Sequence, residues 1–294
     1  MTELFGYPVP VILGQLMLGL VNGSFYAMLS LGLAVIFGLL GVVNFAHGAL
    51  YMLGAYAAFV GLDLLGINYW FALLLSPLAV GALGIVLERL LLRHLYKLDP
   101  LYGLLLTFGL AQIAEGVMSN HYGSSGQSYP VPGALRGAFN LGFMILPIYR
   151  AWVIVASLVV CFTTWFVIER TRLGSTLRAA TENPKLVQAF GINVPIIVMA
   201  TYGAGVGLAA FAGVLSAPLI QITPLMGSSL VIVVFAVVVI GGMGSIFGSI
   251  VSGLVLGMVE GLTKVVYPEA SNVVVFLIMA LVLIWRPAGL FGRT

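Results

Sequence analysis

The residues of this chain best suited to binding a small molecule form a short group, Asn44, His47 and Tyr51. If one helix runs through them, spacings of three and four residues put the three side chains on one face. Gly41 and Gly48 flank the group, which favours a helix start or a discontinuity that opens onto a cavity. In transporters, the N-terminal ends of half-helices bind carboxylates through free N–H groups. The alternative is that Asn44 and His47 only hydrogen-bond to a neighbouring helix.

Two further polar pairs lie inside apolar segments, where ionisable groups are costly. Gln112 and Glu115 are three residues apart, and they fit a hydrated outer vestibule or an interfacial salt bridge equally well. Glu260 and Lys264 are four residues apart, so a helix would bring them together as an ion pair. For this second pair we favour a structural role over a role in transport.

Motifs for chemistry on a substrate are missing. The sequence contains no G-x-x-x-x-G-K-[S/T], H-E-x-x-H or G-x-S-x-G pattern. Its three histidines are far apart, and its one cysteine allows no disulfide or metal framework within the chain. A net charge of +3 is too small to indicate a nucleic-acid partner. We therefore expect no catalytic residue, no metal site and no ATP-binding loop, and we expect translocation rather than catalysis.

The elements that position these residues are apolar helices. Hydrophobic residues make up 61% of the chain and charged residues 7%, with a mean hydropathy of +1.16. Continuous apolar runs long enough to cross a bilayer core of about 30 Å recur along the chain, and a barrel would show short alternating segments instead. We predict an all-α integral membrane protein, a polytopic bundle of about 8–10 transmembrane helices forming one transmembrane domain over residues 1–294. The apolar segments are 11–40, 48–66, 69–92, 101–119, 149–168, 191–217, 226–243, 246–266 and 272–286.

The first segment is too long for one straight crossing, so we expect it to be tilted, broken or one and a half segments. Short basic turns indicate the orientation. They lie at Arg89, Arg93 and Lys97, in the segment 169–192, and at Arg286 and Arg293 in the tail. Placing them on the cytoplasmic side puts the Gly-, Ser- and Pro-rich segment 120–148 outside. Nine spans then place the N-terminus outside, whereas an even number would place it inside.

The segment 169–192, called the island below, holds six of the charged residues. We expect two short helices lying across the cytoplasmic face of the membrane. Ser175 or Gly174 could cap the first, and Asn183 before Pro184 is typical of the N-cap of the second. Arg178 and Glu182 are at i and i+4 within the first helix. A plain solvated connector is the alternative, although the mixture of Ala, Leu and Phe favours helices.

Small residues recur every four positions in several apolar segments. Ser249, Gly253, Gly257 and Gly261 form the longest stripe, and Gly19 with Gly23 repeats the spacing. Such stripes let helix backbones approach closely in lipid. We favour packing within the subunit over a subunit interface.

Several segments together resemble the permease subunits of bacterial branched-chain amino-acid ABC importers. The first is Gly41–Gly48, which contains the N-F-A-H-G sequence, followed by Tyr51–Tyr56. The island is similar to the coupling segment of that family through Gly174, Arg178, Ala179, Glu182, Asn183, Pro184 and Gly191. The late glycines Gly241, Gly242, Gly244, Gly248, Gly253 and Gly257 resemble its late helices, and Pro287–Gly292 its ending. The N-F-A-H-G segment and the short N-terminus point to the shorter of the two paired permease types.

The resemblance implies a multi-pass protein of the bacterial inner membrane that translocates branched-chain or related apolar amino acids. It implies a second permease subunit, two cytoplasmic ATPase subunits that bind the ATP and Mg²⁺, and a periplasmic substrate-binding protein, with no cofactor in this chain. The island would dock on an ATPase. The pathway candidates are Asn44, Phe45, His47, Gly48, Gln112 and Glu115. Ala49 and Phe247 depart from the Glu and the Pro that members commonly carry. Importers of urea, short amides or aromatic acids share the architecture, and a self-contained channel or secondary carrier is a further alternative.

Overall fold

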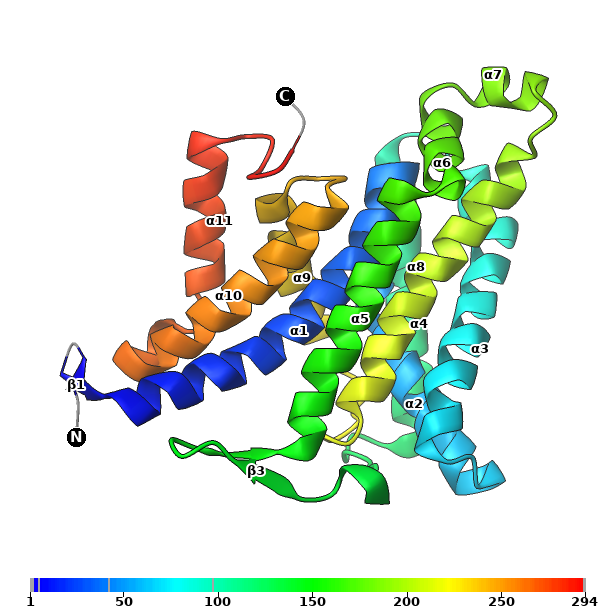
Figure 1. Cartoon of the computed structure of the whole chain (residues 1–294). Helices are drawn as coiled ribbons and strands as arrows, with labels where there is room; N and C mark the ends of the chain where they lie inside the picture. The colour runs from blue at the N-terminus through cyan, green and yellow to red at the C-terminus, as the bar shows by residue number, and fades with distance from the viewer. Residues whose placement is uncertain (1–2, 5, 42, 97, 293–294) are drawn as a thin grey trace. The chain divides into compact units, whose positions relative to one another are not determined.

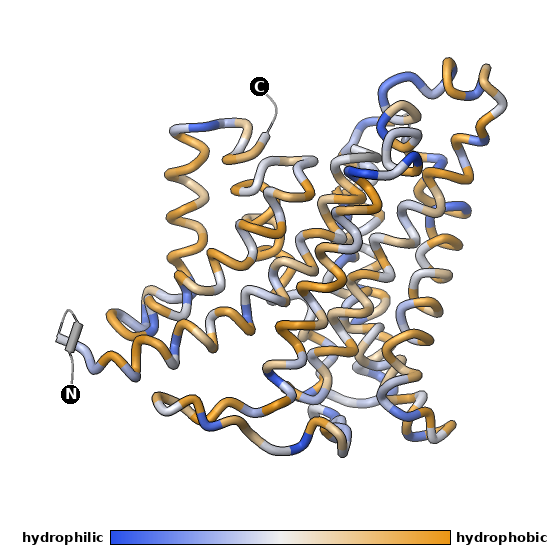
Figure 2. Tube along the Cα trace, in the orientation of Figure 1, coloured by the Kyte–Doolittle hydropathy of each residue, from blue (hydrophilic) through white to orange (hydrophobic). Residues whose placement is uncertain are grey.

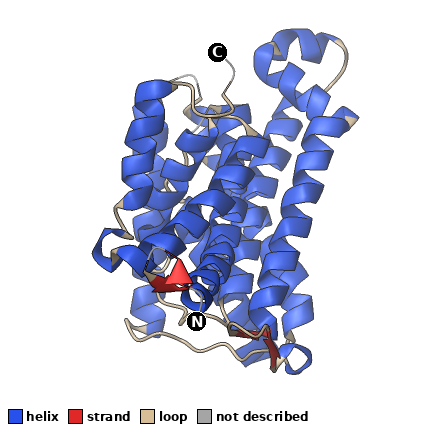
Figure 3. Cartoon of the chain, turned by 60° about the vertical axis from the view of Figure 1, so that its left-hand side comes forward, coloured by secondary structure: helices blue, strands red, loops and turns tan. Residues whose placement is uncertain are grey.

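The computed structural model describes residues 3–4, 6–41, 43–96 and 98–292, and these residues are mostly helical (Figure 3). Lys97 and Arg293, which contributed to the predicted orientation, lie outside the described residues. The α-helices are α1 (Val9–Leu40), α2 (His47–Leu65), α3 (Tyr69–Leu90), α4 (Pro100–Tyr122), α5 (Ile148–Arg170), α6 (Arg172–Glu182), α7 (Pro184–Ala189), α8 (Val194–Ser216), α9 (Ser228–Gly241), α10 (Ile246–Val266) and α11 (Val274–Trp285). The strands form two antiparallel hairpins, β1 (Glu3–Leu4) with β2 (Tyr7–Pro8) and β3 (Ala138–Asn140) with β4 (Ile145–Pro147). Short 3-10 helices are η1 (Leu92–His94), η2 (Gly133–Leu135) and η3 (Pro268–Ala270).

Seven helices of the described chain are long and apolar enough to cross a membrane: α1, α2, α3, α4, α5, α8 and α10. The shorter apolar helices α9 and α11 have 14 and 12 residues. Each of the nine predicted apolar segments corresponds to one of these nine helices, and their apolar character is visible in Figure 2. The predicted all-α multi-pass membrane fold is confirmed. Fewer helices than the predicted 8–10 reach full spanning length, because α9 and α11 rise only about 21 and 18 Å at 1.5 Å per residue.

The first apolar segment forms a single helix, α1, of 32 residues. Polar residues placed just before other helices determine where those helices begin. The side chain of Asn68 accepts a hydrogen bond from Phe71 N at the start of α3, and that of Asp99 accepts one from Leu101 N at the start of α4. Asn193 and Ser245 cap α8 and α10 in the same way. These caps satisfy N–H groups that a helix leaves without an internal partner.

The chain divides into two compact units, and the first contains residues 1–30, 130–161 and 233–294. Within this unit, the glycine stripe of α10 runs antiparallel to the first part of α1. A Cβ atom at Gly23 would lie 2.8 Å from Leu254 O, and one at Gly253 would lie 2.5 Å from Ala27 Cα. Gly257 lies against the backbone of Gly23 in the same contact. The stripe therefore packs backbone against backbone inside the subunit, as small residues allow.

The predicted pair of Glu260 and Lys264 is present as an ion pair on α10. Glu260 is buried, and its Oε2 also accepts a hydrogen bond from the Tyr26 hydroxyl of α1 at 2.7 Å. The carboxylate thus has a partner on each side. It ties the two helices together at the end of the glycine contact.

A tight turn follows α9, with Gly242 and Gly244 at φ values of 99° and 88°. Gly241 and Gly248 lie against one another across this turn. The C-terminal segment returns to it: Leu290 N donates to Ile240 O at 2.8 Å, and Phe291 N donates to Gly241 O at 3.1 Å. The predicted packing glycines of this region are therefore where the chain turns and where its C-terminal segment attaches.

The second unit contains residues 31–129 and 162–232, and its helices α2 and α3 pack on α8. Gly81 and Pro77 of α3 contact Gly203 and Gly207 of α8 respectively, so these two helices are antiparallel. The end of α3 therefore lies at the same end of the unit as the start of α8. The island helices α6 and α7 lie at this same end (Figure 1, upper right).

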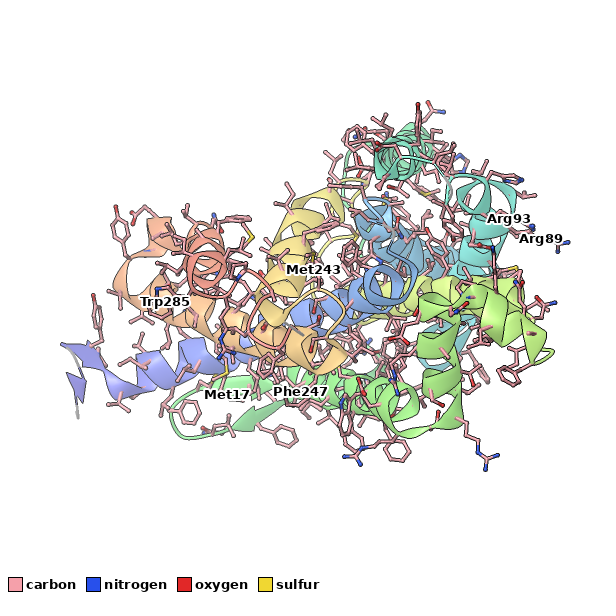
Figure 4. The ribbon with its side chains drawn as sticks, turned by 90° about the horizontal axis from the view of Figure 1, so that it is seen from above. Met17, Arg89, Arg93, Met243, Phe247 and Trp285 are labelled. Atoms are coloured by element: carbon pink, nitrogen blue, oxygen red, sulfur yellow. The ribbon has the colours of Figure 1, made fainter. Side chains whose placement is uncertain are left out.

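Arg89 in the last turn of α3 and Arg93 in η1 are exposed and point away from the helices (Figure 4). The basic turn after α3 and the island thus share one side of the second unit. This agrees with placing both in the cytoplasm, as the charge pattern predicted.

Candidate functional site

The described residues 41 and 43–46, which lie between α1 and α2 and are not helical, are called the break segment. Gly41 has a φ of 66°, a conformation that residues other than glycine rarely adopt, and its N–H donates to Phe37 O at 2.8 Å. The predicted discontinuity is confirmed. The prediction that Asn44 and His47 share one helical face is wrong, because α1 has ended before Asn44 and α2 begins only at His47.

The break segment is held by side-chain hydrogen bonds. Asn44 Oδ1 accepts from Ala46 N at 3.1 Å, and Phe45 N donates to Oγ1 of Thr107 on α4 at 3.1 Å. Asn44 is 0% exposed and His47 is 1% exposed. A Cβ atom at Gly48 would lie 2.8 Å from the carbonyl carbon of Gly227, so the start of α2 packs on bare backbone. Asn44, Phe45, His47 and Gly48 therefore lie together at one bend between α1 and α2, and their role in a pathway stays a prediction.

Tyr202 of α8 lies beside the break segment and is 1% exposed. The side-chain amide of Asn44 lies close to the Tyr202 hydroxyl. Nevertheless, neither Asn44 Nδ2 nor the Tyr202 hydroxyl completes a hydrogen bond within the described residues. Most buried polar groups in folded proteins have partners. Two unsatisfied ones side by side therefore mark an unusual place in this unit.

Glu88 of α3 is buried, and its carboxylate is near enough to Tyr202 to interact with it electrostatically. Oε1 of Glu88 accepts a hydrogen bond from the Tyr96 hydroxyl at 3.1 Å. Burial, followed by the nearby carboxyl of Glu88, raises the pKa of Tyr96, so this phenol stays protonated and donates. Sequence reasoning overlooked Glu88 and Tyr202. An acid inside the apolar segment 69–92 was a usable signal for Glu88, but Tyr202 gave none beyond its place in an apolar span.

Gln112 and Glu115, the predicted polar pair on α4, differ in burial. Its buried side carries Thr107, Ala111 and Glu115, at intervals of four residues. Gln112 is exposed, whereas Glu115 is 7% exposed and lies beside Ser228, the first residue of α9. The structure thus brings Thr107 to the break segment and separates Gln112 from Glu115.

The island forms the two predicted helices, α6 and α7. The predicted N-cap of α7 is confirmed: Asn183 Oδ1 accepts from Leu186 N at 3.1 Å, and Pro184 is the first helical residue. The predicted cap of α6 at Ser175 or Gly174 is wrong, because α6 begins at Arg172 directly after Thr171. The Thr171 hydroxyl donates to Val167 O of α5, so only one residue separates the two helices.

Gly174 and Arg178 attach α6 to the last turn of α5. A Cβ atom at Gly174 would overlap the carbonyl group of Ile168 and lie 2.7 Å from its Cα. Arg178 Nη1 donates to Ile168 O at 2.9 Å and lies 3.5 Å from Glu169 Oε2. Arg178 thus pairs with Glu169 rather than with Glu182. A cation at the C-terminal end of a helix also interacts favourably with its unpaired carbonyl groups.

A small apolar core joins the island to α8: Ala180 of α6, Val187 of α7 and Val194 of α8 are buried together. The remaining predicted coupling residues, Ala179, Glu182, Asn183, Pro184 and Gly191, are exposed. Large apolar side chains are exposed as well: Leu173 by 73%, Leu186 by 54% and Phe190 by 76%. The island therefore has one face attached to α5 and α8 and another whose apolar side chains the described residues leave exposed.

The arrangement suits binding better than chemistry. Over the described residues, no three His, Cys, Asp or Glu side chains gather as they would around a metal ion. Around the break segment lie hydrogen-bond donors, the N-terminus of α2 and the buried carboxyl of Glu88 on α3. The island offers an exposed apolar face. Such features hold and move a ligand or a partner without breaking bonds.

Comparison with known proteins connects these features to a family. A family model described as the permease component of branched-chain amino acid transport systems matches residues 15–283. The high-affinity branched-chain amino acid transport system permease protein BraD of Pseudomonas aeruginosa is 32% identical over 306 residues, covering 100% of this chain and 98% of BraD. The corresponding LivH protein of Escherichia coli is 31% identical over 310 residues, with the same coverage. The LivM permease protein of Escherichia coli is 26% identical over 294 residues, covering 92% of this chain but 68% of LivM.

Proposed function

This chain belongs to the family of branched-chain amino acid transport permeases, and to its shorter, LivH-like type, and from this premise we propose how it works. It is a multi-pass membrane permease subunit, a transporter component rather than an enzyme, for branched-chain amino acids. It acts in the bacterial inner membrane with a second, longer permease subunit. The energy comes from two cytoplasmic ATPase subunits that bind ATP and Mg²⁺, and a periplasmic protein delivers the substrate. The chain itself needs no cofactor.

The attachment of the island is the observation that carries this proposal. α6 is fixed to α5 through Gly174 and Arg178, and the core around Val194 fixes α6 and α7 to α8. A partner that displaces the island therefore displaces the ends of two membrane-spanning helices. A loop attached by flexible linkers would not transmit such a displacement.

The exposed apolar side chains of the island supply the docking surface. Exposed apolar groups on a polar segment mark contact with a protein or a membrane surface. Phe190, 76% exposed, follows α7 and is the largest of the three. We place it in the contact with an ATPase subunit, together with the exposed residues Ala179, Glu182, Asn183, Pro184 and Gly191.

The substrate passes along the second unit, beside the break segment. Asn44, Phe45, His47 and Gly48 form its bend, and Glu115 is buried on α4. Because α8 carries Tyr202 against the bend and also starts at the island core, displacement of the island moves one wall of this region. Energy input and pathway are thus connected through a single helix.

The test uses this chain, its longer permease partner and the two ATPases, reconstituted in liposomes with the periplasmic protein. We expect ATP-dependent leucine uptake by the wild type. Phe190→Asp abolishes both the co-purification of the ATPases and uptake. The matched control is Leu98→Asp, because Leu98 is 52% exposed in the turn after α3 on the same side of the second unit.

Three outcomes would contradict the proposal. Leucine transport by this chain alone, without ATP, would make it a self-contained carrier. Full ATPase binding by Phe190→Asp would remove the docking assignment. Quenching of a fluorophore attached beside Phe190 by quencher-bearing lipids, in the assembled complex, would show that the island rests on lipid instead.

A further inference from the structure

The N-terminal end of α2 is buried and has no side-chain cap among the described residues. His47 to Met52 are all buried, and Ala46 before them provides no side-chain acceptor. The first N–H groups of a helix have no partner inside the helix, and they form the positive end of its dipole. An end of this kind favours an anion. On its own it does not identify a ligand.

Two buried donors at the same end supply the second observation. Asn44 Nδ2, three residues before the helix, and the Tyr202 hydroxyl are both unsatisfied within the described residues. Asn44 Oδ1 is engaged by Ala46 N, and Ala46 shares a buried cluster with Tyr202. Leaving a buried donor unpaired is costly. Two such donors next to a helix N-terminus indicate that an acceptor occupies this place during the transport cycle.

The surrounding charge selects the kind of acceptor. Glu88, on the neighbouring helix α3, is buried and interacts electrostatically with Tyr202. Arg93 interacts electrostatically with Glu88. Glu88 would repel a simple anion bound at Tyr202. A zwitterion avoids this conflict, because its carboxylate can face the donors while its ammonium group faces Glu88. The rest of the cluster is aliphatic, and its members are Ile36, Leu50, Val80, Leu92, Val206 and Ala210.

We infer that a free α-amino acid with an aliphatic side chain binds at the N-terminal end of α2 during translocation. Its carboxylate accepts hydrogen bonds from Asn44 Nδ2 and the Tyr202 hydroxyl at the positive end of α2, whose first N–H, that of His47, already donates to Asn44 O, and its ammonium group faces Glu88. The inference rests on the proposed function and adds the groups that recognise the substrate. Urea and simple amides lack both charges, and aromatic acids without an amino group lack the cation.

The test measures equilibrium binding of radiolabelled leucine to the purified permease–ATPase complex without the periplasmic protein. We expect saturable binding by the wild type. Tyr202→Phe, which removes only the hydroxyl, weakens it about tenfold to a hundredfold, as expected for a hydrogen bond to a charged group. The matched control is Tyr56→Phe, because the hydroxyl of Tyr56 is also buried and unsatisfied within the described residues. It should change the affinity less than twofold.

Competition by analogues identifies each end of the ligand. Leucinamide, which lacks the carboxylate, and 4-methylpentanoate, which lacks the ammonium group, should each compete at least tenfold more weakly than leucine. Glu88→Gln should reduce the preference for leucine over 4-methylpentanoate. Asn44→Asp keeps the acceptor for Ala46 N but replaces the free donor by a charge, so it should abolish binding. It provides a second variant if Tyr202→Phe fails to assemble.

The inference is overturned if the wild-type complex shows no saturable leucine binding, or if Tyr202→Phe and Tyr56→Phe bind leucine equally. Equal competition by the two analogues would also overturn it. The proposed function is judged separately, by ATP-driven leucine uptake of the wild type. Uptake that persists unchanged in Tyr202→Phe leaves the function standing and removes this site.

Discussion

Replacing Gly174 by alanine should uncouple the island from the membrane-spanning helices. The new Cβ would lie 2.7 Å from Ile168 Cα, whereas carbon atoms in contact prefer about 3.5–4.0 Å, so α6 must move away by about 1 Å or more. That shift lengthens the hydrogen bond from Arg178 Nη1 to Ile168 O from 2.9 Å to about 4 Å, which breaks it. Because Arg178 is 36% exposed, the bond contributes only about 1 kcal/mol. The larger effect is on geometry.

The assay compares leucine uptake and ATP hydrolysis in the same proteoliposomes. We expect uptake by Gly174→Ala to fall about tenfold or more, since a displacement of about 1 Å can cost up to a hundredfold where function depends on positioning. ATP hydrolysis should persist, so the number of leucine molecules transported per ATP falls. The control is Gly109→Ala in α4, where a Cβ atom meets nothing within 4 Å. Normal transport per ATP in an assembled Gly174→Ala complex would refute the reasoning.

Two stability predictions concern the buried hydrogen bonds. Thr107→Val removes the acceptor of Phe45 N and should destabilise the break segment by about 1–3 kcal/mol, seen as faster hydrogen exchange at Phe45; unchanged exchange would show that another group replaces Thr107. Glu260→Ala leaves Lys264 and the Tyr26 hydroxyl without their shared partner and should cost about 3 kcal/mol, measured by thermal unfolding in detergent. A melting temperature equal to that of wild type would show that this ion pair contributes nothing to stability.

Local signals predicted the helices well. The nine apolar runs became nine apolar helices, and Asn183 before Pro184 started α7 as expected, because capping depends on a few neighbouring residues. The start of α6 was predicted wrongly for a related reason. Ser175 and Gly174 are plausible caps in isolation, but Thr171 bonds to the turn before it, so α6 follows α5 after a single residue.

The spacing of residues in the sequence did not predict contacts between distant segments. Tyr202 meets Asn44 because α8 crosses the bend between α1 and α2, and no spacing in the sequence connects residues so far apart. The spacing of Asn44 and His47 was misleading because a helical face exists only where the helix continues, and Gly41 ends it. Gln112 and Glu115 likewise differ in exposure because the buried stripe of α4 is narrow.

The contact between α1 and α10 has a consequence for how this protein can evolve. When two side chains touch, an enlarged one can be rescued by a second mutation that shrinks its neighbour. At Gly19, Gly23, Gly253 and Gly257 the neighbouring atoms belong to the peptide backbone. No second substitution can remove those atoms. An added methyl group there has no partner to compensate it, so each of these glycines must be retained independently of the others.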